Sequence, residues 1–147
     1  MNSVTTMQVS FRRLSPDTPI PEYKTPGACA FDIAVLEEKT LQPGERAIFA
    51  TGLVVKVPEG HVLLLCSRSS NAKKGISMAN GVGVIDQDYC GPNDELKCVL
   101  LNSGQEPYTV QKGERAMQGL IIPIAQATFL ETNELASQDR GGFGTTG

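Results

Sequence analysis

The segment at residues 80–89 combines glycines, apolar residues and carboxylates in an order that suits a small flat ligand. Gly81 and Gly83 have no side chain, so the backbone here can approach a ligand closely. The apolar residues that follow would bring the carboxylate of Asp86 to the end of a strand, where it can orient an attacking water. Taken alone, the pattern also fits a hairpin whose acidic residues form a solvated turn.

Residues 67–70, Ser-Arg-Ser-Ser, place hydroxyl and guanidinium groups together. They stand between an apolar strand pattern and a short helix, so these side chains and the free helical N–H groups would point to one place. Such a group suits a phosphate, which an arginine can bind through two hydrogen bonds. A capped surface helix with an incidental arginine is an equally good interpretation of this segment alone.

Asp32 is a second isolated carboxylate, after the small and apolar residues 28–31. A metal there would be a hard cation such as Mg²⁺, which takes few protein oxygens together with substrate phosphate oxygens. The four cysteines show no C-x-x-C spacing and His61 is the only histidine, which argues against a zinc centre and against serine–histidine catalysis. The cysteines are predicted to be reduced, mainly structural thiols.

Short strands must position these groups. The sequence has 15 glycines, 9 prolines and only 5% aromatic residues, and turn signals recur at short intervals. This pattern favours a sandwich, barrel or jelly roll. The one predicted helix starts near Ser69 or Ser70, a natural N-cap, and ends at Gly75. The predicted strands lie within residues 47–57, 61–66, 81–85, 95–101 and 118–124.

Length and charge exclude several classes of protein. A chain of 147 residues fits one domain. A net charge of −3 gives no basic field, so no nucleic-acid polymer is expected as a partner. No apolar run is long enough to span a membrane, and the first 14 residues lack the pattern of a cleaved signal. These features predict a cytoplasmic protein without a membrane partner.

Five segments resemble, in order, the five motifs of the trimeric dUTP diphosphatase (dUTPase) family. The resemblance spans nearly the whole chain, and the third motif and the Gly-Phe-Gly ending are its most specific parts. The second motif has Ser70 and Asn71 where the family commonly has Gly and Leu. The five segments are residues 26–33, 67–72, 80–89, 113–118 and 140–147.

This resemblance implies an all-β, jelly-roll-like fold with one short helix and a flexible glycine-rich C-terminal arm. It divides the chain into a β domain at residues 1–139 and a mobile arm at residues 140–147. It also implies a homotrimer with active sites shared between subunits, which hydrolyses dUTP to dUMP and pyrophosphate with Mg²⁺. Such an activity would limit uracil incorporation into DNA and supply dUMP for thymidylate synthesis.

The resemblance also implies roles for the matched residues. Asp86 would hold the attacking water, and Asp32 would support catalysis by contacting the metal through water. Tyr89 would pack under the deoxyribose and exclude a 2′-hydroxyl, while Phe143 would cover the uracil. The other residues implied to bind the base or the phosphates are Arg68, Ser69, Ser70, Asn80, Gly83, Gln118, Arg140, Gly144 and Thr145.

Two alternatives come from different classes. A dCTP deaminase resembles this chain in fold and in the Arg-Ser-Ser-x-Ala pattern of residues 68–72, but such deaminases place a glutamate where Val99 stands. Without that general acid/base deamination has no proton shuttle, and Val99 is predicted to be an ordinary core residue. The second alternative is a non-catalytic nucleotide sensor or protein-binding module, since a fold does not fix an activity. The water-orienting Asp86 argues against it.

Overall fold

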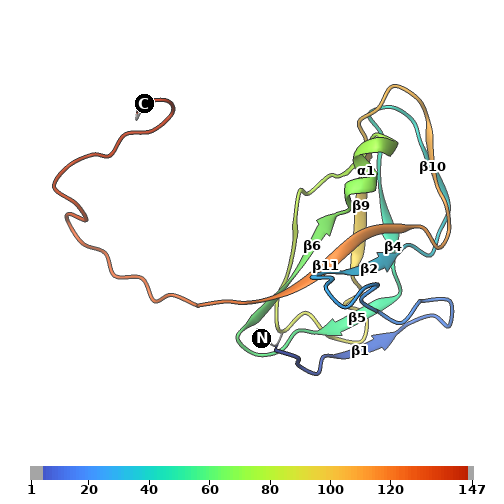
Figure 1. Cartoon of the computed structure of the whole chain (residues 1–147), viewed down its shortest axis with the longest axis horizontal. Helices are drawn as coiled ribbons and strands as arrows, with labels where there is room; N and C mark the ends of the chain where they lie inside the picture. The colour runs from blue at the N-terminus through green and yellow to red at the C-terminus, as the bar shows by residue number, and fades with distance from the viewer. Residues whose placement is uncertain (1–4, 146–147) are drawn as a thin grey trace.

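The chain folds almost entirely into short strands (Figure 1), as the turn spacing predicts. The computed structural model describes residues 5–145, and α1 (Ser69–Lys74) is the one helix among them. The strands are β1 (Ser10–Arg13), β2 (Phe31–Ala34), β3 (Lys39–Leu41), β4 (Arg46–Ala50), β5 (Leu53–Lys56), β6 (His61–Ser67), β7 (Ile76–Met78), β8 (Gly83–Ile85), β9 (Lys97–Asn102), β10 (Tyr108–Val110) and β11 (Arg115–Pro123).

Two larger sheets form the body of the molecule. One has four strands in the order β2-β11-β6-β8, and the other has three in the order β4-β9-β7. The remaining described strands form the pairs β1-β5 and β10-β3, and all these pairings are antiparallel. The predicted all-β class with one short helix is confirmed. No helix within residues 5–145 is long and apolar enough to cross a membrane.

Both larger sheets contribute one face to a common core. Successive residues of a strand point to opposite faces, so every second residue is buried along β9 and in the middle of β6, at Leu63 and Leu65. Leu63 of β6, Phe49 of β4 and Leu100 of β9 are fully buried in this core. At Gly119 a Cβ atom would lie 2.7 Å from the ring of Phe31, so only glycine fits between β11 and β2.

Residues 47–57, predicted as one strand, are two strands in different sheets. β4 pairs with β9, whereas β5 pairs with β1. Gly52 turns the chain between them at φ +69°, and a Cβ atom there would lie 2.1 Å from the hydroxyl of Thr18. Only Thr51 and Gly52 separate the apolar runs of the two strands, and so short an interruption does not show in the hydrophobic pattern.

Two predictions about single residues are wrong in detail. The helix α1 begins at Ser69, as predicted, but its N-cap is Arg68, without a side-chain cap, rather than Ser69 or Ser70. The predicted end at Gly75 is confirmed by its left-handed φ of 71°. Val99 is half-buried rather than a fully buried core residue, because it pairs with the exposed Ile48 on the outward face of the three-stranded sheet.

A long arm leaves the body after β11. Its last backbone contact with the body is the hydrogen bond from Ile124 N to the carbonyl oxygen of Gly60, at 2.9 Å. Residues 125–145 then extend away from the sheets (Figure 1). The division at residue 139 and the mobility of residues 140–147 stay predictions. Residues 1–4, and residues 146 and 147 of the predicted arm, lie outside the described residues.

Candidate active site

A carboxylate held between two guanidinium groups lies where β2, β6 and β11 approach α1. Asp32 Oδ1 forms an ion pair with Arg68 Nε at 2.8 Å, and its Oδ2 accepts a hydrogen bond from Arg115 Nη1 at 3.3 Å. Arg68 Nη1 also donates to the carbonyl oxygen of Arg115 at 2.8 Å. We call Asp32, Arg68, Arg115 and the neighbouring Gln118 the arginine cluster.

Strand register and a bulge bring this cluster together. Gln118 of β11 pairs with Asp32 of β2, so both side chains project from the same face of the sheet. The β11–β2 register shifts between Arg115 and Met117, which leaves Ala116 as the extra residue of a β-bulge. A bulge re-aims the side chain beside it. Here it brings Arg115 to the carboxylate of Asp32.

The arginine cluster keeps donors free for an anion. Arg68 has five N–H donors, and its contacts to Asp32 and to the Arg115 carbonyl use two of them. Its side chain is 26% exposed, so the remaining donors can reach a ligand. Two guanidinium groups around one carboxylate leave a net positive charge. This suits a phosphate, which a planar guanidinium can bind through two oxygens.

The serines beside Arg68 differ from each other. Ser69 is exposed, whereas the Ser70 hydroxyl is buried and has no hydrogen-bond partner among the described residues. A substrate contact from Ser70 would therefore use its backbone N–H. The Gln118 side-chain amide is held by the carbonyl oxygen of Ser67 at 2.9 Å.

A glycine-containing hairpin forms the second group of predicted site residues. Gly81 has φ +72° and its N–H bonds to the carbonyl oxygen of Met78, which closes the turn where Asn80 is exposed. Gly83 is buried, and a Cβ atom there would lie 3.0 Å from the Cβ of Leu65. Packing of β8 on β6 thus requires this glycine, and only its backbone can contact a substrate.

Asp86 follows β8 and is exposed. Its carbonyl oxygen accepts a hydrogen bond from Tyr89 N at 3.2 Å, and the Tyr89 hydroxyl donates to the carbonyl oxygen of Glu95 at 3.0 Å. These two hydrogen bonds hold the half-buried ring of Tyr89 in the turn that follows Asp86. Asp86 also lines a hollow of about 560 Å³, together with Glu59 and His61.

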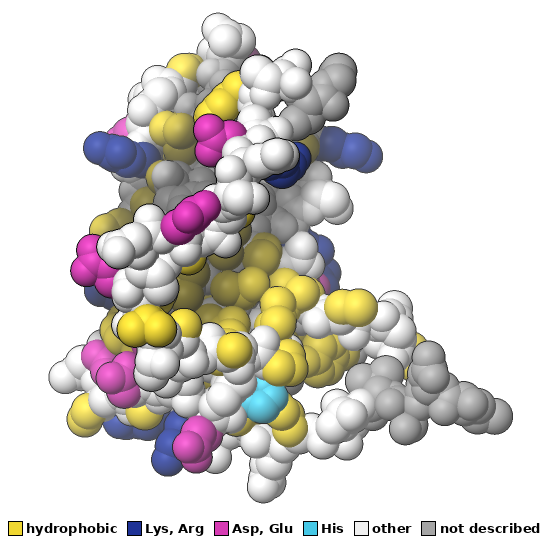
Figure 2. All heavy atoms as spheres, turned by 90° about the vertical axis from the view of Figure 1, so that its left-hand side faces the viewer, with side chains coloured by type: hydrophobic (Ala, Val, Ile, Leu, Met, Phe, Trp, Pro, Cys, Tyr) yellow, Lys and Arg dark blue, Asp and Glu magenta, His cyan; other side chains and the backbone are white. Residues whose placement is uncertain are grey.

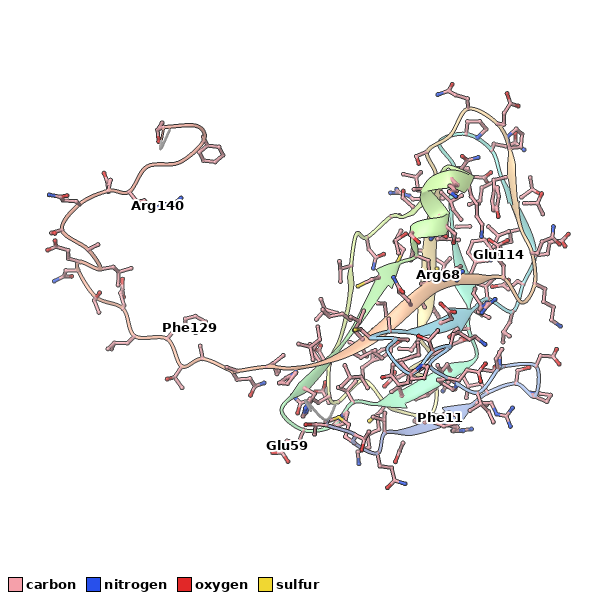
Figure 3. The ribbon with its side chains drawn as sticks, in the orientation of Figure 1. Phe11, Glu59, Arg68, Glu114, Phe129 and Arg140 are labelled. Carbon is pink, nitrogen blue, oxygen red and sulfur yellow. The ribbon has the colours of Figure 1, made fainter. Side chains whose placement is uncertain are left out.

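The arginine cluster and Asp86 lie at opposite ends of β6. The register of β8 on β6 places Asp86 level with Val62, whereas Arg68 follows the last residue of β6. Six residues along a strand correspond to about 20 Å. Figure 3 shows Arg68 at one end of β6 and Glu59, which lines the Asp86 hollow, beyond the other. One protomer therefore cannot bring both groups to the same phosphate.

Between these groups the outward surface of the four-stranded sheet is apolar. Leu64 pairs with Leu120 on one side and with Val84 on the other. Val84 is 62% exposed and Ile122 is 37% exposed. We call Val62, Leu64, Val84, Leu120 and Ile122 the apolar face. Figure 2 shows apolar side chains gathered in a hollow on the side from which the arm leaves.

The predicted residues of the arm lie apart from both groups. Arg140 stands far from Arg68 and Glu59 (Figure 3). Phe143 is fully exposed and adopts a φ of 51°, and the Thr145 hydroxyl donates to the carbonyl oxygen of Gly142 at 2.7 Å. The predicted site residues thus form three separate groups within one protomer: the arginine cluster, the hairpin with Asp86, and the arm.

Sequence reasoning missed two residues at the arginine cluster. Arg115 lies within the fourth motif segment, but only the bulge shows that its side chain reaches Asp32. Asn71 is 1% exposed and bonds to Ser67 and Ala116. A polar residue in a short helix gives no sequence signal for such burial.

Fold and site together define a nearly all-β protein with an anion-binding cluster and a hairpin suited to a flat ligand. Residues 17–147 match the family model described as dUTPase. A deoxyuridine 5′-triphosphate nucleotidohydrolase of Nautilia profundicola is 38% identical over 144 residues, covering 96% of this chain and 99% of its own. One of Anaeromyxobacter sp. is 42% identical over 135 residues, covering 90% of each chain.

Solved structures with a similar fold are also dUTPases. The dUTPase from Streptococcus mutans superposes with a TM-score of 0.74 at 30% identity, covering 81% of this chain and 98% of its own. The Staphylococcus bacteriophage 80alpha dUTPase with dUPNHPP superposes with a TM-score of 0.85 at 26% identity, covering 97% and 99%. The chain belongs to the dUTPase family. The predicted jelly-roll-like fold and the predicted class of enzyme, a dUTP diphosphatase, are confirmed at the level of this family.

Proposed function

We propose that this protein hydrolyses dUTP to dUMP and pyrophosphate at sites shared between the subunits of a homotrimer. The observation that carries the proposal is the distance of about 20 Å along β6 between Asp86 and the arginine cluster. A water aligned by Asp86 and phosphates held by Arg68 must meet on one triphosphate. A second copy of the chain can supply the half of the site that the first copy holds too far away.

The apolar face supports the assembly. Covering exposed apolar side chains such as Val84 and Ile122 with another protein surface lowers the free energy and favours association. The apolar face also lies between the two halves of the site, so a neighbour packed on or beside it would bring its own groups close to them. When one patch binds a different patch on the next copy, identical subunits form a closed ring if the rotation between copies closes.

Asp86 performs the proton transfer in this proposal. It orients a water for attack on the α-phosphorus and accepts a proton as the new P–O bond forms. The bond from the α-phosphorus to the bridging oxygen breaks, and pyrophosphate leaves with that oxygen. Phosphoryl transfer needs aligned reactants and charge neutralisation more than a covalent nucleophile.

The other groups hold the substrate in place. Arg68, Ser69 and Gln118 bind phosphate oxygens from the arginine cluster, with further donors from the backbone of the arm. Asn80 and the backbone of residues 81–85 contact the uracil. Tyr89 packs under the deoxyribose, where its ring leaves no room for a 2′-hydroxyl. Arg140, Phe143, Gly144 and Thr145 close over the substrate from a neighbouring subunit.

Mg²⁺ fits this donor set as a companion of the triphosphate. Both carboxylate oxygens of Asp32 already contact Arg68 and Arg115, which favours a contact to the ion through water. Among residues 5–145, no three His, Cys, Asp or Glu side chains gather into a metal cage. Mg²⁺ commonly keeps several waters and takes the rest of its oxygens from substrate phosphates. When bound, it would neutralise phosphate charge.

In a cell this reaction would limit uracil incorporation into DNA and supply dUMP for thymidylate synthesis. We propose that the protein acts in the cytoplasm, without a nucleic-acid or membrane partner.

A turnover assay tests the proposal. The purified chain is incubated with Mg²⁺ and dUTP, dCTP or UTP, and dUMP, pyrophosphate and ammonia are measured. The proposal expects equal amounts of dUMP and pyrophosphate from dUTP, at least about 100-fold slower turnover of UTP because of Tyr89, and no ammonia. Ammonia release from dCTP would support the deaminase alternative, and tight dUTP binding without turnover would support a nucleotide sensor.

A further inference from the structure

Asn71 lies beside the arginine cluster, and its side chain is buried although it belongs to a short helix at the surface. It is 1% exposed. Its Nδ2 donates to the carbonyl oxygen of Ala116 at 2.9 Å and to the hydroxyl oxygen of Ser67 at 3.0 Å. We propose that Asn71 is a positioning residue, which fixes the β11 bulge and thereby sets the geometry of the phosphate-binding arginines. The proposal rests on the proposed function.

The carbonyl group of Ala116 lies at the bulge, where the Asn71 amide donates to it. Ala116 is the residue skipped by the β11–β2 register, and the pairing of β11 with β6 ends one residue later, at Met117 and Ser67. Ala116 therefore lies both at the bulge and at the end of the β11–β6 ladder. A buried carbonyl is stabilised by a hydrogen bond from a buried amide, so the side chain of Asn71 stabilises this backbone conformation.

Arg68 likewise stabilises the carbonyl group of Arg115, the residue before Ala116. Its Nη1 donates to the carbonyl oxygen of Arg115 while its Nε binds Asp32. Two consecutive carbonyl groups of β11 are thus held by side chains from residues 68–71. This connection joins α1, β11 and β2 in the one place where Asp32, Arg68 and Arg115 meet.

Asn71 acts as a donor in this arrangement. Its Oδ1 is buried without a hydrogen-bond partner among the described residues, while its Nδ2 has two oxygen partners. Turning the amide over would place an oxygen against the carbonyl oxygen of Ala116. A carboxylate at this position has nearly the same shape as the amide, but when ionised it can only repel that carbonyl.

Without the donor, the bulge relaxes and moves Arg115 and Arg68 relative to Asp32. A displacement of about 1 Å at a catalytic group can cost about 100-fold in rate. Loss of Asn71 should therefore weaken phosphate binding at the arginine cluster, while the hairpin at residues 80–89 keeps its affinity for the nucleoside. A merely structural role would affect both ends of the substrate alike.

The chain offers a matched control in Asn102. This residue is also 1% exposed, and its Nδ2 donates to the carbonyl oxygens of Leu41 and Glu106, each at 2.8 Å. Its hydrogen bonds reach no member of the arginine cluster. Replacing Asn102 removes a buried amide that bridges two backbone carbonyls, without disturbing the bulge.

The experiment compares Asn71→Asp with Asn102→Asp at pH 8, where an ordinary carboxyl group is ionised. Dissociation constants are measured for Mg²⁺-pyrophosphate and for deoxyuridine, well below each variant's Tm. An Asn71→Ala and Asn102→Ala pair provides the same comparison if either aspartate variant is too unstable to purify. Turnover of dUTP is measured in parallel, so that kcat and KM are separated.

We expect Asn71→Asp to weaken pyrophosphate binding at least about 10-fold and to lower kcat by about 10- to 100-fold. Deoxyuridine binding should stay within about twofold of the wild type, and Asn102→Asp should lower the Tm without changing either dissociation constant by more than that. Wild-type-like pyrophosphate binding by both Asn71 variants overturns the inference, as does equal weakening of both probes. A wild-type protein that binds pyrophosphate but does not hydrolyse dUTP contradicts the proposed function and leaves the positioning role measurable.

Discussion

Asp86 carries the proposed proton transfer, and it is exposed at the end of β8 where an incoming water can reach it. We predict that Asp86→Asn lowers kcat for dUTP by at least about 100-fold, because an amide cannot accept the proton of the attacking water. Binding of a non-hydrolysable dUTP analogue should remain nearly unchanged, since the amide has the same shape. Steady-state kinetics and calorimetric titration check both parts, and turnover within tenfold of the wild type would remove Asp86 from this role.

The sequence predicted Asp32, Arg68 and Gln118 as site residues, and the structure brings them together. Asp32 and Arg68 were singled out by residue types beside apolar strand patterns, whereas Gln118 was implied by the resemblance to the dUTPase family. Arg115 and Asn71 were missed for a physical reason. Both depend on the register shift at Ala116, and a bulge is created by pairing between strands distant in the sequence. The roles of the predicted residues stay predictions.

At the scale of elements, the buried Cys98 thiol of β9 makes the free energy of unfolding depend on pH. Burial raises the pKa of the Cys98 thiol to about 12, whereas an unfolded cysteine titrates near ~8.5. Between these two pKa values the folded state therefore keeps a proton that the unfolded state has lost. The stability that this thiol contributes is fully present below about pH 8.5, and it is lost as the pH rises towards the pKa of the folded state. We predict that the free energy of unfolding falls by about 1.4 kcal/mol per pH unit between pH 9 and 11 through this thiol.

Denaturant titrations across this pH range check the prediction. Cys98→Ala should be less stable at pH 7 because it leaves a cavity, but its stability should fall less steeply as the pH rises. In this variant the free energy of unfolding should still fall with pH above pH 10. Burial and the neighbouring Glu114 carboxylate raise the pKa of Tyr108 to about 12, so its hydroxyl also ionises first in the unfolded state. Equal slopes in the variant and the wild type would contradict the assignment to Cys98.

The arm is the element whose removal should separate activity from folding. Past Ile124 it extends away from the body of its own protomer (Figure 1). Deleting residues 140–147 should lower kcat by about 100-fold, the scale of losing a set of positioned donors. The Tm and the oligomeric state should stay unchanged, as measured by calorimetry and light scattering. An unchanged kcat would mark the deleted segment as a dispensable end.

Elements were predicted best where the apolar pattern is long. β6 and β11 follow the predicted runs closely, and Gly75 ends α1 as expected. The three- and four-residue strands β1, β2, β3, β7 and β10 were not predicted, because so few residues show no clear period of two. The corner at Gly52 was hidden because apolar residues continue on both sides of it.

At the scale of the whole molecule, the proposed site depends on assembly. The sequence places Asp86 and Arg68 only 18 positions apart (86 − 68), and nothing in that spacing shows that they occupy opposite ends of β6. The resemblance to a trimeric family implied shared sites, and the separation of about 20 Å gives that expectation a physical basis. Composition alone could predict one β domain, but not its assembly.

Mixing two inactive variants tests the shared site most directly. Asp86→Asn and Arg68→Ala proteins are unfolded together, refolded at equal concentrations and assayed with dUTP and Mg²⁺, and each variant refolded alone is the control. If each site takes Asp86 from one subunit and Arg68 from the next, every mixed trimer contains one intact site. Random mixing then restores about a quarter of wild-type turnover. No recovery in trimers shown by mass spectrometry to be mixed would contradict the shared site.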